Sequence, residues 1–159
     1  MTTEEYNNAV KGLANRLCRF ADKLLLDADT AKDITQEAFL KLWENKNQVN
    51  PVKIKSWLFT TTYRLCINHI QRRKIIARVV LEKELSVQPE NPDLKDIINN
   101  TFSLLPPIQR TILLMRDYEG YNYQEIGEML ELNESQVKVY LFRARQKIKD
   151  HIKDLKLVL

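Results

Sequence analysis

Residues 121–149 read YNYQEIGEMLELNESQVKVYLFRARQKIK, a stretch that predicts two short helices separated by a break at residues 131–133. In the first helix, Ile126, Met129 and Leu130 recur at the spacing of one buried helix face. The second helix carries an apolar stripe at the same spacing, made of Val137, Leu141, Ala144 and Ile148. Two helices joined in this way have the pattern of a helix-turn-helix.

The second of these helices is strongly basic away from its apolar stripe. No acidic residue lies between Gln136 and Lys149, and the cations there are Lys138, Arg143, Arg145, Lys147 and Lys149. A helix with such a face can lie in the major groove of DNA. The alternative interpretation is an ordinary helical hairpin whose basic face is solvated.

Both helices begin with residues suited to capping. Asn122 with Glu125, and Asn133 with Gln136, have the spacing of a capping box. Each cap is expected to stabilise its helix by about 1 kcal/mol. Gly127 in the middle of a helix costs roughly 1 kcal/mol relative to Ala, and we expect a close crossing with the second helix to compensate.

Composition favours a folded, mostly helical chain. The 159 residues are 44% hydrophobic and include only three Gly and five Pro, with few alternating β-branched runs. The net charge is +4, so the clustering of basic residues matters more than their total. Two cysteines provide no disulfide framework, no signal peptide or membrane span is recognisable, and we expect a cytoplasmic protein.

The first half predicts three helices. Apolar residues recur at helical spacing from Tyr6 to Leu24, and a second amphipathic pattern runs from Ala31 to about Glu44. A polar loop containing Pro51 follows, and then a long helix over about residues 54–80. That helix begins with aromatic residues and ends with basic ones, and it contains no acid from Trp57 to Leu81.

An acidic, proline-containing stretch of low apolar content separates the two halves. Residues 82–96 hold five acids and two prolines, which is typical of an interdomain linker. Leu104-Leu105-Pro106-Pro107 opens the second half, since proline is tolerated in the first turn of a helix. Gly120 suits the end of that helix. We therefore expect an all-α protein of two small helical domains joined by a flexible linker.

Four motifs in this order resemble the extracytoplasmic-function (ECF) sigma factors of bacteria. They are Asp33-Ile34-Thr35-Gln36-Glu37-Ala38-Phe39-Leu40-Lys41-Leu42-Trp43, Ser56-Trp57-Leu58-Phe59, Leu105-Pro106 with Arg110, and Phe142-Arg143-Ala144-Arg145. The resemblance covers nearly the full chain. It implies region two over residues 5–76, a linker over 77–99 and region four over 100–155, and it implies no catalytic activity.

The resemblance also implies partners. The family binds core RNA polymerase, with region two on the clamp helices of the β′ subunit and region four on the β flap. The residues that correspond to the core-binding motif are Asp33, Gln36, Glu37 and Leu40. The family further implies promoter DNA as a ligand, and an inhibitory anti-sigma factor that is often anchored in the membrane.

Region two would hold melted minus-ten DNA, and region four would bind the minus-thirty-five duplex. Basic side chains neutralise phosphates, while Asn and Gln can pair with adenine edges. The expected minus-ten residues are Lys46, Lys53, Lys55, Arg64, Asn68, Gln71, Arg72, Arg73 and Lys74. The expected minus-thirty-five residues are Ser135, Gln136, Lys138, Val139 and Arg143, with Arg145 and Lys147 on phosphates.

Some positions depart from the commonest family pattern. It has Asn, Asp and Arg where this chain has Arg64, Asn68 and Gln71, and it has Gly-Thr and Ser-Arg at 135–136 and 139–140, where this chain has Ser-Gln and Val-Tyr. These positions lie on the expected reading surfaces, so they bear on the promoter sequence rather than on the fold.

Two other functions are consistent with parts of the chain. A stand-alone helix-turn-helix regulator would need no polymerase, but it leaves the motif at Asp33 without a role. A small enzyme or metal-dependent regulator could use Cys66 and His69, one helical turn apart. Zinc sites usually show two ligand pairs at short spacing, and no activated nucleophile or phosphate-binding loop is recognisable. We therefore expect neither metal nor cofactor.

Overall fold

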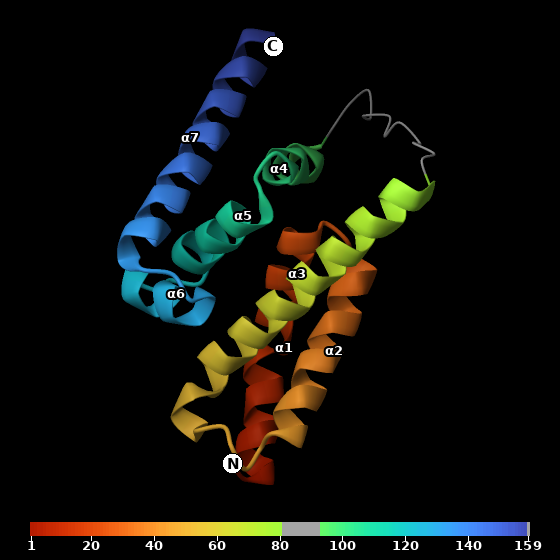
Figure 1. Ribbon diagram of the computed structural model, residues 1–159, viewed down its shortest axis with the longest axis vertical. Coiled ribbons are helices and arrows are strands. Elements are labelled where there is room, and N and C mark those ends of the chain that lie inside the picture. Colours follow the sequence, from red (N-terminus) through yellow and green to blue (C-terminus); the bar gives the residue numbers. More distant parts are fainter. Residues whose placement is uncertain (81–92, 159) are drawn as a thin grey trace.

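The first block of the protein is a bundle of three long helices. The computed structural model describes residues 1–80 and 93–158, without the side chains of 78–80 and 157–158. Helices α1 (Thr3–Leu25) and α2 (Ala28–Glu44) pack side by side, and α3 (Ile54–Val80) crosses both after the short 3-10 helix η1 (Pro51–Lys53) (Figure 1). The centre of this bundle is fully buried and includes Leu17, Leu24, Ala38, Leu42, Leu58 and Phe59.

Local chemistry fixes the tight connection between α1 and α2. Leu26 ends α1 in the left-handed conformation, at φ 57°, and the next residue, Asp27, caps α2. The Asp27 carboxylate accepts hydrogen bonds from the Thr30 backbone N–H at 3.1 Å and from the Thr30 hydroxyl at 2.7 Å. This short turn makes the two helices antiparallel neighbours, with the opposite face of α2 left to solvent.

The second block contains the predicted helix-turn-helix. Its elements are α4 (Leu94–Ser103), α5 (Pro107–Leu113), the π-helical turn η2 (Leu114–Tyr118), α6 (Tyr123–Leu130) and α7 (Glu134–Val158). Both predicted capping boxes are present, because Asn122 and Asn133 each exchange hydrogen bonds of 2.8–3.0 Å with the residue three positions on. The described residues form helices and no strand, which confirms the all-α expectation.

Part of the expected linker is helical. Within the expected linker, residues 77–99, α3 continues to Val80, as the helix predicted over residues 54–80 does, and α4 begins at Leu94. The reason is chemical, since Asp93 and Asp96 form a capping box at the start of α4 instead of belonging to an extended acidic segment. The remainder of the expected linker, residues 81–92, lies outside the described residues.

The expected reason for Gly127 needs correction. A Cβ atom at this position would lie 2.5 Å from the backbone oxygen of Leu132, in the turn, rather than against the body of α7. The Gly127 carbonyl also accepts the Leu132 N–H at 2.8 Å. Glycine is thus required because the turn folds back over α6, which sets the angle at which α7 departs.

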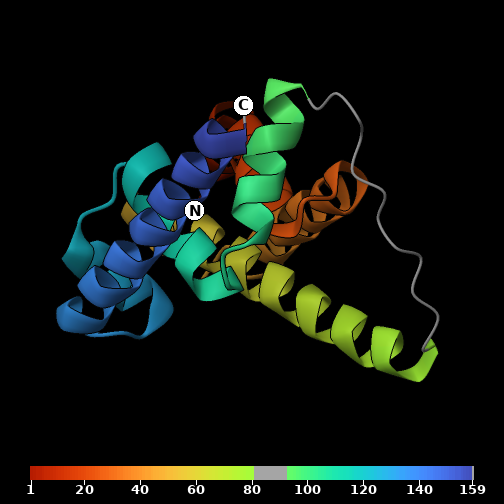
Figure 2. The ribbon, with the colours of Figure 1, turned by 90° about the horizontal axis from the view of Figure 1, so that it is seen from above.

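The two blocks pack against each other through several elements, and two of the contacts are polar contacts to α1. Arg16 on α1 forms an ion pair with Glu119, just after η2, and Arg110 on α5 donates a hydrogen bond to the Leu24 carbonyl at the end of α1. Viewed from above, the last turns of α3 project beyond both blocks (Figure 2). Among the described helices, none combines the length and apolar character needed to cross a bilayer.

Candidate nucleic-acid interface

Helix α7 lies at the outer edge of the molecule (Figure 1), and many of its exposed residues are polar. Its other side is anchored by Val137, Leu141 and Ala144, which are at most 2% exposed. All of the residues expected to contact minus-thirty-five DNA are exposed, namely Ser135, Gln136, Lys138, Val139, Arg143, Arg145 and Lys147. The helix is therefore held from behind, and its outward face is open to a duplex.

Two of the basic residues on α7 are already held by neighbours. Arg145 pairs with Asp117 of η2, with its Nη2 at 2.5 Å and its Nε at 3.3 Å from the two carboxylate oxygens. That hydrogen bond raises the pKa of Arg145. Lys138 places its Nζ 5.4 Å from the centre of the Tyr123 ring. A phosphate at Arg145 would have to share this side chain with Asp117, whereas Arg143 has no such competitor among the described residues.

Phe142 is a surface feature that the sequence prediction left out. Its side chain is 67% exposed, beside Val139 at 45% and the basic residue Arg143. An exposed aromatic ring here has no role in the core, because the buried stripe of α7 lies on the other side. The sequence could have indicated this residue, because Phe142 is apolar but does not follow the spacing of the buried stripe. Phe and Val are side chains that can contact a thymine methyl group.

The motif on α2 forms one exposed face. Asp33, Gln36, Glu37 and Leu40 are all exposed, and their spacing places them on the side of the helix opposite Ile34, Ala38 and Leu42. Leu40 is 55% exposed and adds an apolar side chain to this face. Trp43 continues this face, and it is held by an edge-on contact with Tyr6 at 5.0 Å and by Lys46, whose Nζ lies 3.9 Å from its ring.

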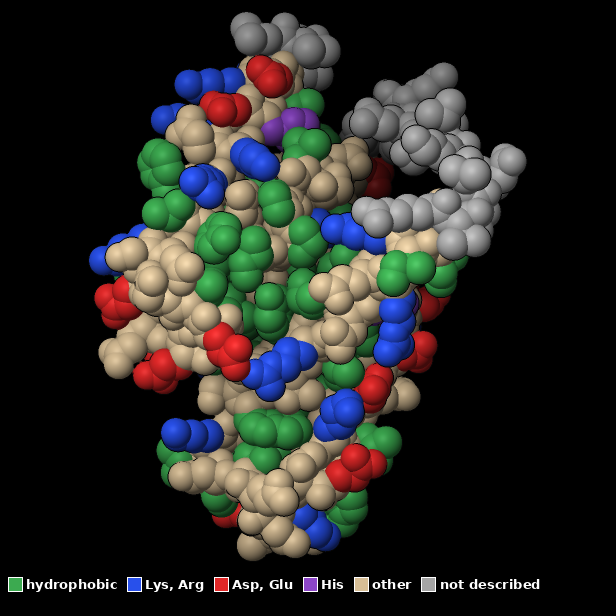
Figure 3. Space-filling model, in the orientation of Figure 1, with side chains coloured by type: hydrophobic (Ala, Val, Ile, Leu, Met, Phe, Trp, Pro, Cys, Tyr) green, Lys and Arg blue, Asp and Glu red, His purple; other side chains and the backbone are tan. Residues whose placement is uncertain are grey.

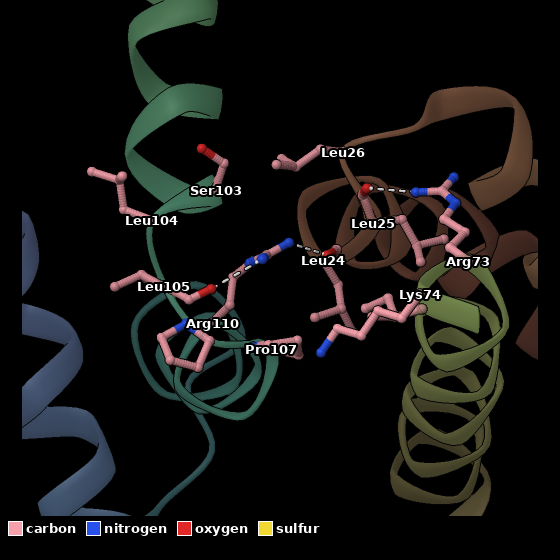
Figure 4. A pocket seen from close by; sticks show the side chains of 12 residues that line it. Leu24, Leu25, Leu26, Arg73, Lys74, Ser103, Leu104, Leu105, Pro107 and Arg110 are labelled. Atoms are coloured by element: carbon pink, nitrogen blue, oxygen red, sulfur yellow. Dashed lines mark hydrogen bonds between the residues drawn. The ribbon is translucent and has the colours of Figure 1, made fainter. Parts of the chain in front are cut away.

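The residues of α3 expected to bind minus-ten DNA divide into two groups. Arg64, Asn68, Gln71 and Arg72 are exposed and share one side of the helix by spacing. Arg73 faces the other way, where it bonds the Asp27 carboxylate and reaches the Leu25 carbonyl at 3.5 Å. Lys74 lies beside it, on the wall of a crevice that the end of α1 and the α4–α5 turn complete (Figure 4). The structure thus does not bring Arg73 together with the first group.

Three expected residues near the start of α3 lie close to the second block. Lys55 places its Nζ 5.1 Å from the centre of the Tyr121 ring, and Arg64 lies 3.6 Å from the Glu131 carboxylate. Lys53 lines the crevice between α3 and α6. Acidic and basic side chains meet where the two blocks adjoin (Figure 3).

Cys66 and His69 lie in a packed part of α3. Burial raises the pKa of the Cys66 thiol to about 12, so this group stays protonated at neutral pH. Desolvation lowers the pKa of His69. Within the described residues, His, Cys, Asp and Glu form no group of three or more that could hold a metal ion.

Comparison with known proteins identifies the two blocks. Residues 9–75 match the family model for sigma-70 region 2, and residues 95–148 match that for sigma-70, region 4. SigV of Bacillus subtilis, an RNA polymerase sigma factor, is 30% identical over 130 residues, which cover 79% of this chain and 78% of that protein. The ECF sigma factor SigE of Mycolicibacterium smegmatis is 27% identical over 92% of this chain, which spans 61% of that longer protein.

Solved structures share the fold. The sigma factor RpoE in complex with the anti-sigma factor NepR from Bartonella quintana matches with a TM-score of 0.75 and 20% identity, over 95% of this chain and 98% of that one. CnrH in complex with the cytosolic domain of CnrY matches with a TM-score of 0.71 and 17% identity, over 94% of this chain and 88% of that one. The chain therefore belongs to the ECF group of RNA polymerase sigma factors, which are transcription initiation factors and not enzymes.

Proposed function

We propose that this protein binds core RNA polymerase in the cytoplasm and directs it to promoters through separate minus-ten and minus-thirty-five contacts. The observation that carries the proposal is the coexistence of three exposed surfaces on three helices of one chain. These are the acidic and apolar face of α2, the basic face of α3 and the outward face of α7.

The α2 face suits a protein partner. Leu40 and Trp43 supply apolar contact area, and Asp33 and Glu37 supply charge that would orient a basic helix. Family membership makes the β′ clamp helices of the polymerase the proposed occupant. The β flap is correspondingly proposed to bind the second block.

The α3 face suits melted DNA. Arg64 and Arg72 can neutralise phosphates, and Asn68 and Gln71 can pair with base edges between them. Lys46, Lys53 and Lys55, in and after the loop that precedes η1, are proposed to contribute further contacts to this DNA, and Lys53 lines the same crevice as Arg64. Binding through such contacts falls steeply with salt, because each neutralised phosphate releases a counterion.

The α7 face suits duplex DNA. We propose that Ser135, Gln136, Lys138, Val139 and Arg143 contact base edges, with Arg145 and Lys147 on phosphates. The similarity to the sigma factor RpoE, solved in complex with the anti-sigma factor NepR, further supports an anti-sigma factor as a partner of this chain, and membrane anchoring of that factor is part of the proposal.

Run-off transcription with cognate core polymerase tests the proposal. Wild-type protein should direct initiation from a defined promoter, and Glu37→Ala should weaken core affinity about tenfold, equivalent to about 1.4 kcal/mol. Promoter contacts by α7 should be unchanged in this variant. Glu4→Ala, which removes an exposed acid from α1, is the matched control. Specific duplex binding that needs no core polymerase would instead favour a stand-alone helix-turn-helix regulator.

A further inference from the structure

The corner Glu119-Gly120-Tyr121 inserts between α1 and α3 of the first block. Gly120, at φ 75°, provides the reversal that carries the chain out of η2. Glu119 accepts two hydrogen bonds from Arg16, at 3.1 Å from Nε and 2.5 Å from Nη2, and its side chain is only 11% exposed. The Arg16 side chain is 35% exposed, so this charge-assisted contact between the blocks is sheltered on the Glu119 side.

Tyr121, the last residue of the corner, packs its ring into the first block. It is 5% exposed and packs edge-on against Phe59 of α3, with ring centres 5.7 Å apart. Phe59 in turn packs against Phe20 of α1 at 5.3 Å. The corner is therefore continuous with the core of the first block, and it draws Lys55 over the Tyr121 ring.

This docking places an acidic helix over the start of the proposed minus-ten surface. Glu125 and Glu128 of α6 line the same crevice as Lys53 and Arg64, and Glu131 at the end of α6 reaches Arg64. Asn68, Gln71 and Arg72, further along α3, remain exposed. The second block thus opposes positive charge where DNA phosphates would otherwise lie.

At the other end of the interface, Arg110 adds an independent contact. Its buried guanidinium donates to the carbonyls of Leu24, in α1, and of Leu105, at 3.0 Å for the latter (Figure 4). Burial lowers the pKa of Arg110. Because Leu24 belongs to the last turn of α1, this cation also complements the negative end of that helix.

We propose that the free protein is closed on itself, with the Glu119-Gly120-Tyr121 corner as a latch that shields the first part of the minus-ten surface. The inference rests on the proposed function, since that function assigns the surface being shielded. Opening must precede DNA binding at this surface. The apparent affinity for DNA is therefore the affinity of the open form multiplied by the fraction of molecules that are open.

Charge reversal at the latch tests this inference. Glu119→Arg and Arg16→Glu each place like charges together, and both should increase binding of free protein to short single-stranded DNA of randomised sequence, measured by fluorescence anisotropy. The expected gain is roughly fivefold to thirtyfold, because losing one such contact shifts a two-state equilibrium by about that factor. The double variant Arg16→Glu/Glu119→Arg should restore the weak binding of wild type.

The two single variants change net charge in opposite directions, which separates opening from simple attraction to DNA. Glu4→Arg adds the same charge as Glu119→Arg outside the interface and should produce no comparable gain. Opposite effects of the two single variants, or equal gains in Glu4→Arg and Glu119→Arg, would overturn the latch.

Small-angle X-ray scattering measures how compact the free protein is, and it requires neither DNA nor polymerase. The radius of gyration should rise in both single variants and return to the wild-type value in the double variant. An unchanged radius in all variants would overturn the inference, whatever the transcription assay shows. A radius that changes as expected, in a protein that fails to direct initiation, would contradict the proposed function and leave the closed arrangement standing.

Discussion

Asp27 is the residue at which helix capping and an ion pair meet. Its hydrogen bonds to Thr30, followed by the charge of Arg73, lower the pKa of this carboxyl group. A carboxyl group with a lowered folded-state pKa stabilises the fold above its unfolded pKa, near 3.9, and that contribution is lost as the pH falls through the folded value.

Asp27→Ala should therefore destabilise the protein in a pH-dependent way. The expected loss in unfolding free energy is about 1 kcal/mol at pH 7, mainly from the lost cap, and the difference from wild type should shrink at pH 3. Urea unfolding at both pH values measures it. Asp27→Asn retains a capping oxygen, so its unfolding free energy should lie between those of wild type and Asp27→Ala. An equal loss at both pH values would refute the assignment.

Individual site residues could be predicted only where the signal is local. The buried stripe of α7 and the capping pair Asn133 and Gln136 follow from spacing within one helix, and the structure confirms both. The partners of Arg73 and Arg145 could not be foreseen, because Asp27 and Asp117 lie 46 and 28 positions away in sequence. A basic residue on a helix carries no local sign of such a partner.

At the scale of elements, long amphipathic patterns predicted helices well. The expected helix over residues 54–80 coincides with α3, and the expected start near Ala31 lies within α2. Helix α4 was missed because its first residues, Asp93 and Asp96, contribute to the acidic composition that suggested a linker. Composition is an average over a stretch of residues, so it does not show where a helix begins. A capping box, by contrast, depends on two residues three positions apart.

The surroundings of two helical glycines, Gly127 in α6 and Gly12 in α1, predict opposite effects of substitution by alanine. Gly127→Ala should destabilise the protein by about 2 kcal/mol, since the new methyl group would meet a backbone oxygen that cannot move aside cheaply. Gly12→Ala, also within a helix but with no atom within 4 Å of the added Cβ, should stabilise it by about 0.5–1 kcal/mol. Chemical denaturation of both variants checks the opposite signs. Stabilisation by Gly127→Ala would show that helix propensity outweighs the turn.

At the scale of the whole molecule, the arrangement of the two blocks was beyond sequence reasoning. Arg16 and Glu119 are 103 positions apart, and Arg110 reaches a carbonyl 86 positions away. Arg16 and Glu119 belong to no recognised motif. Arg110 does belong to one, but nothing in that motif indicates that its side chain reaches Leu24 in α1. Tyr121 itself stood at the edge of the helix-turn-helix pattern, with no local sign that it packs against another domain.

Tyr121 should couple the unfolding of the two blocks. Tyr121→Ala removes a buried ring from their interface, and a loss of about 3 kcal/mol is expected, with one thermal transition separating into two. Tyr121→Phe keeps the ring and should preserve a single transition, because the buried Tyr121 hydroxyl has no hydrogen-bond partner among the described residues. Differential scanning calorimetry distinguishes these outcomes. Equal destabilisation by both substitutions would mean that the hydroxyl group, rather than the packed ring, joins the blocks.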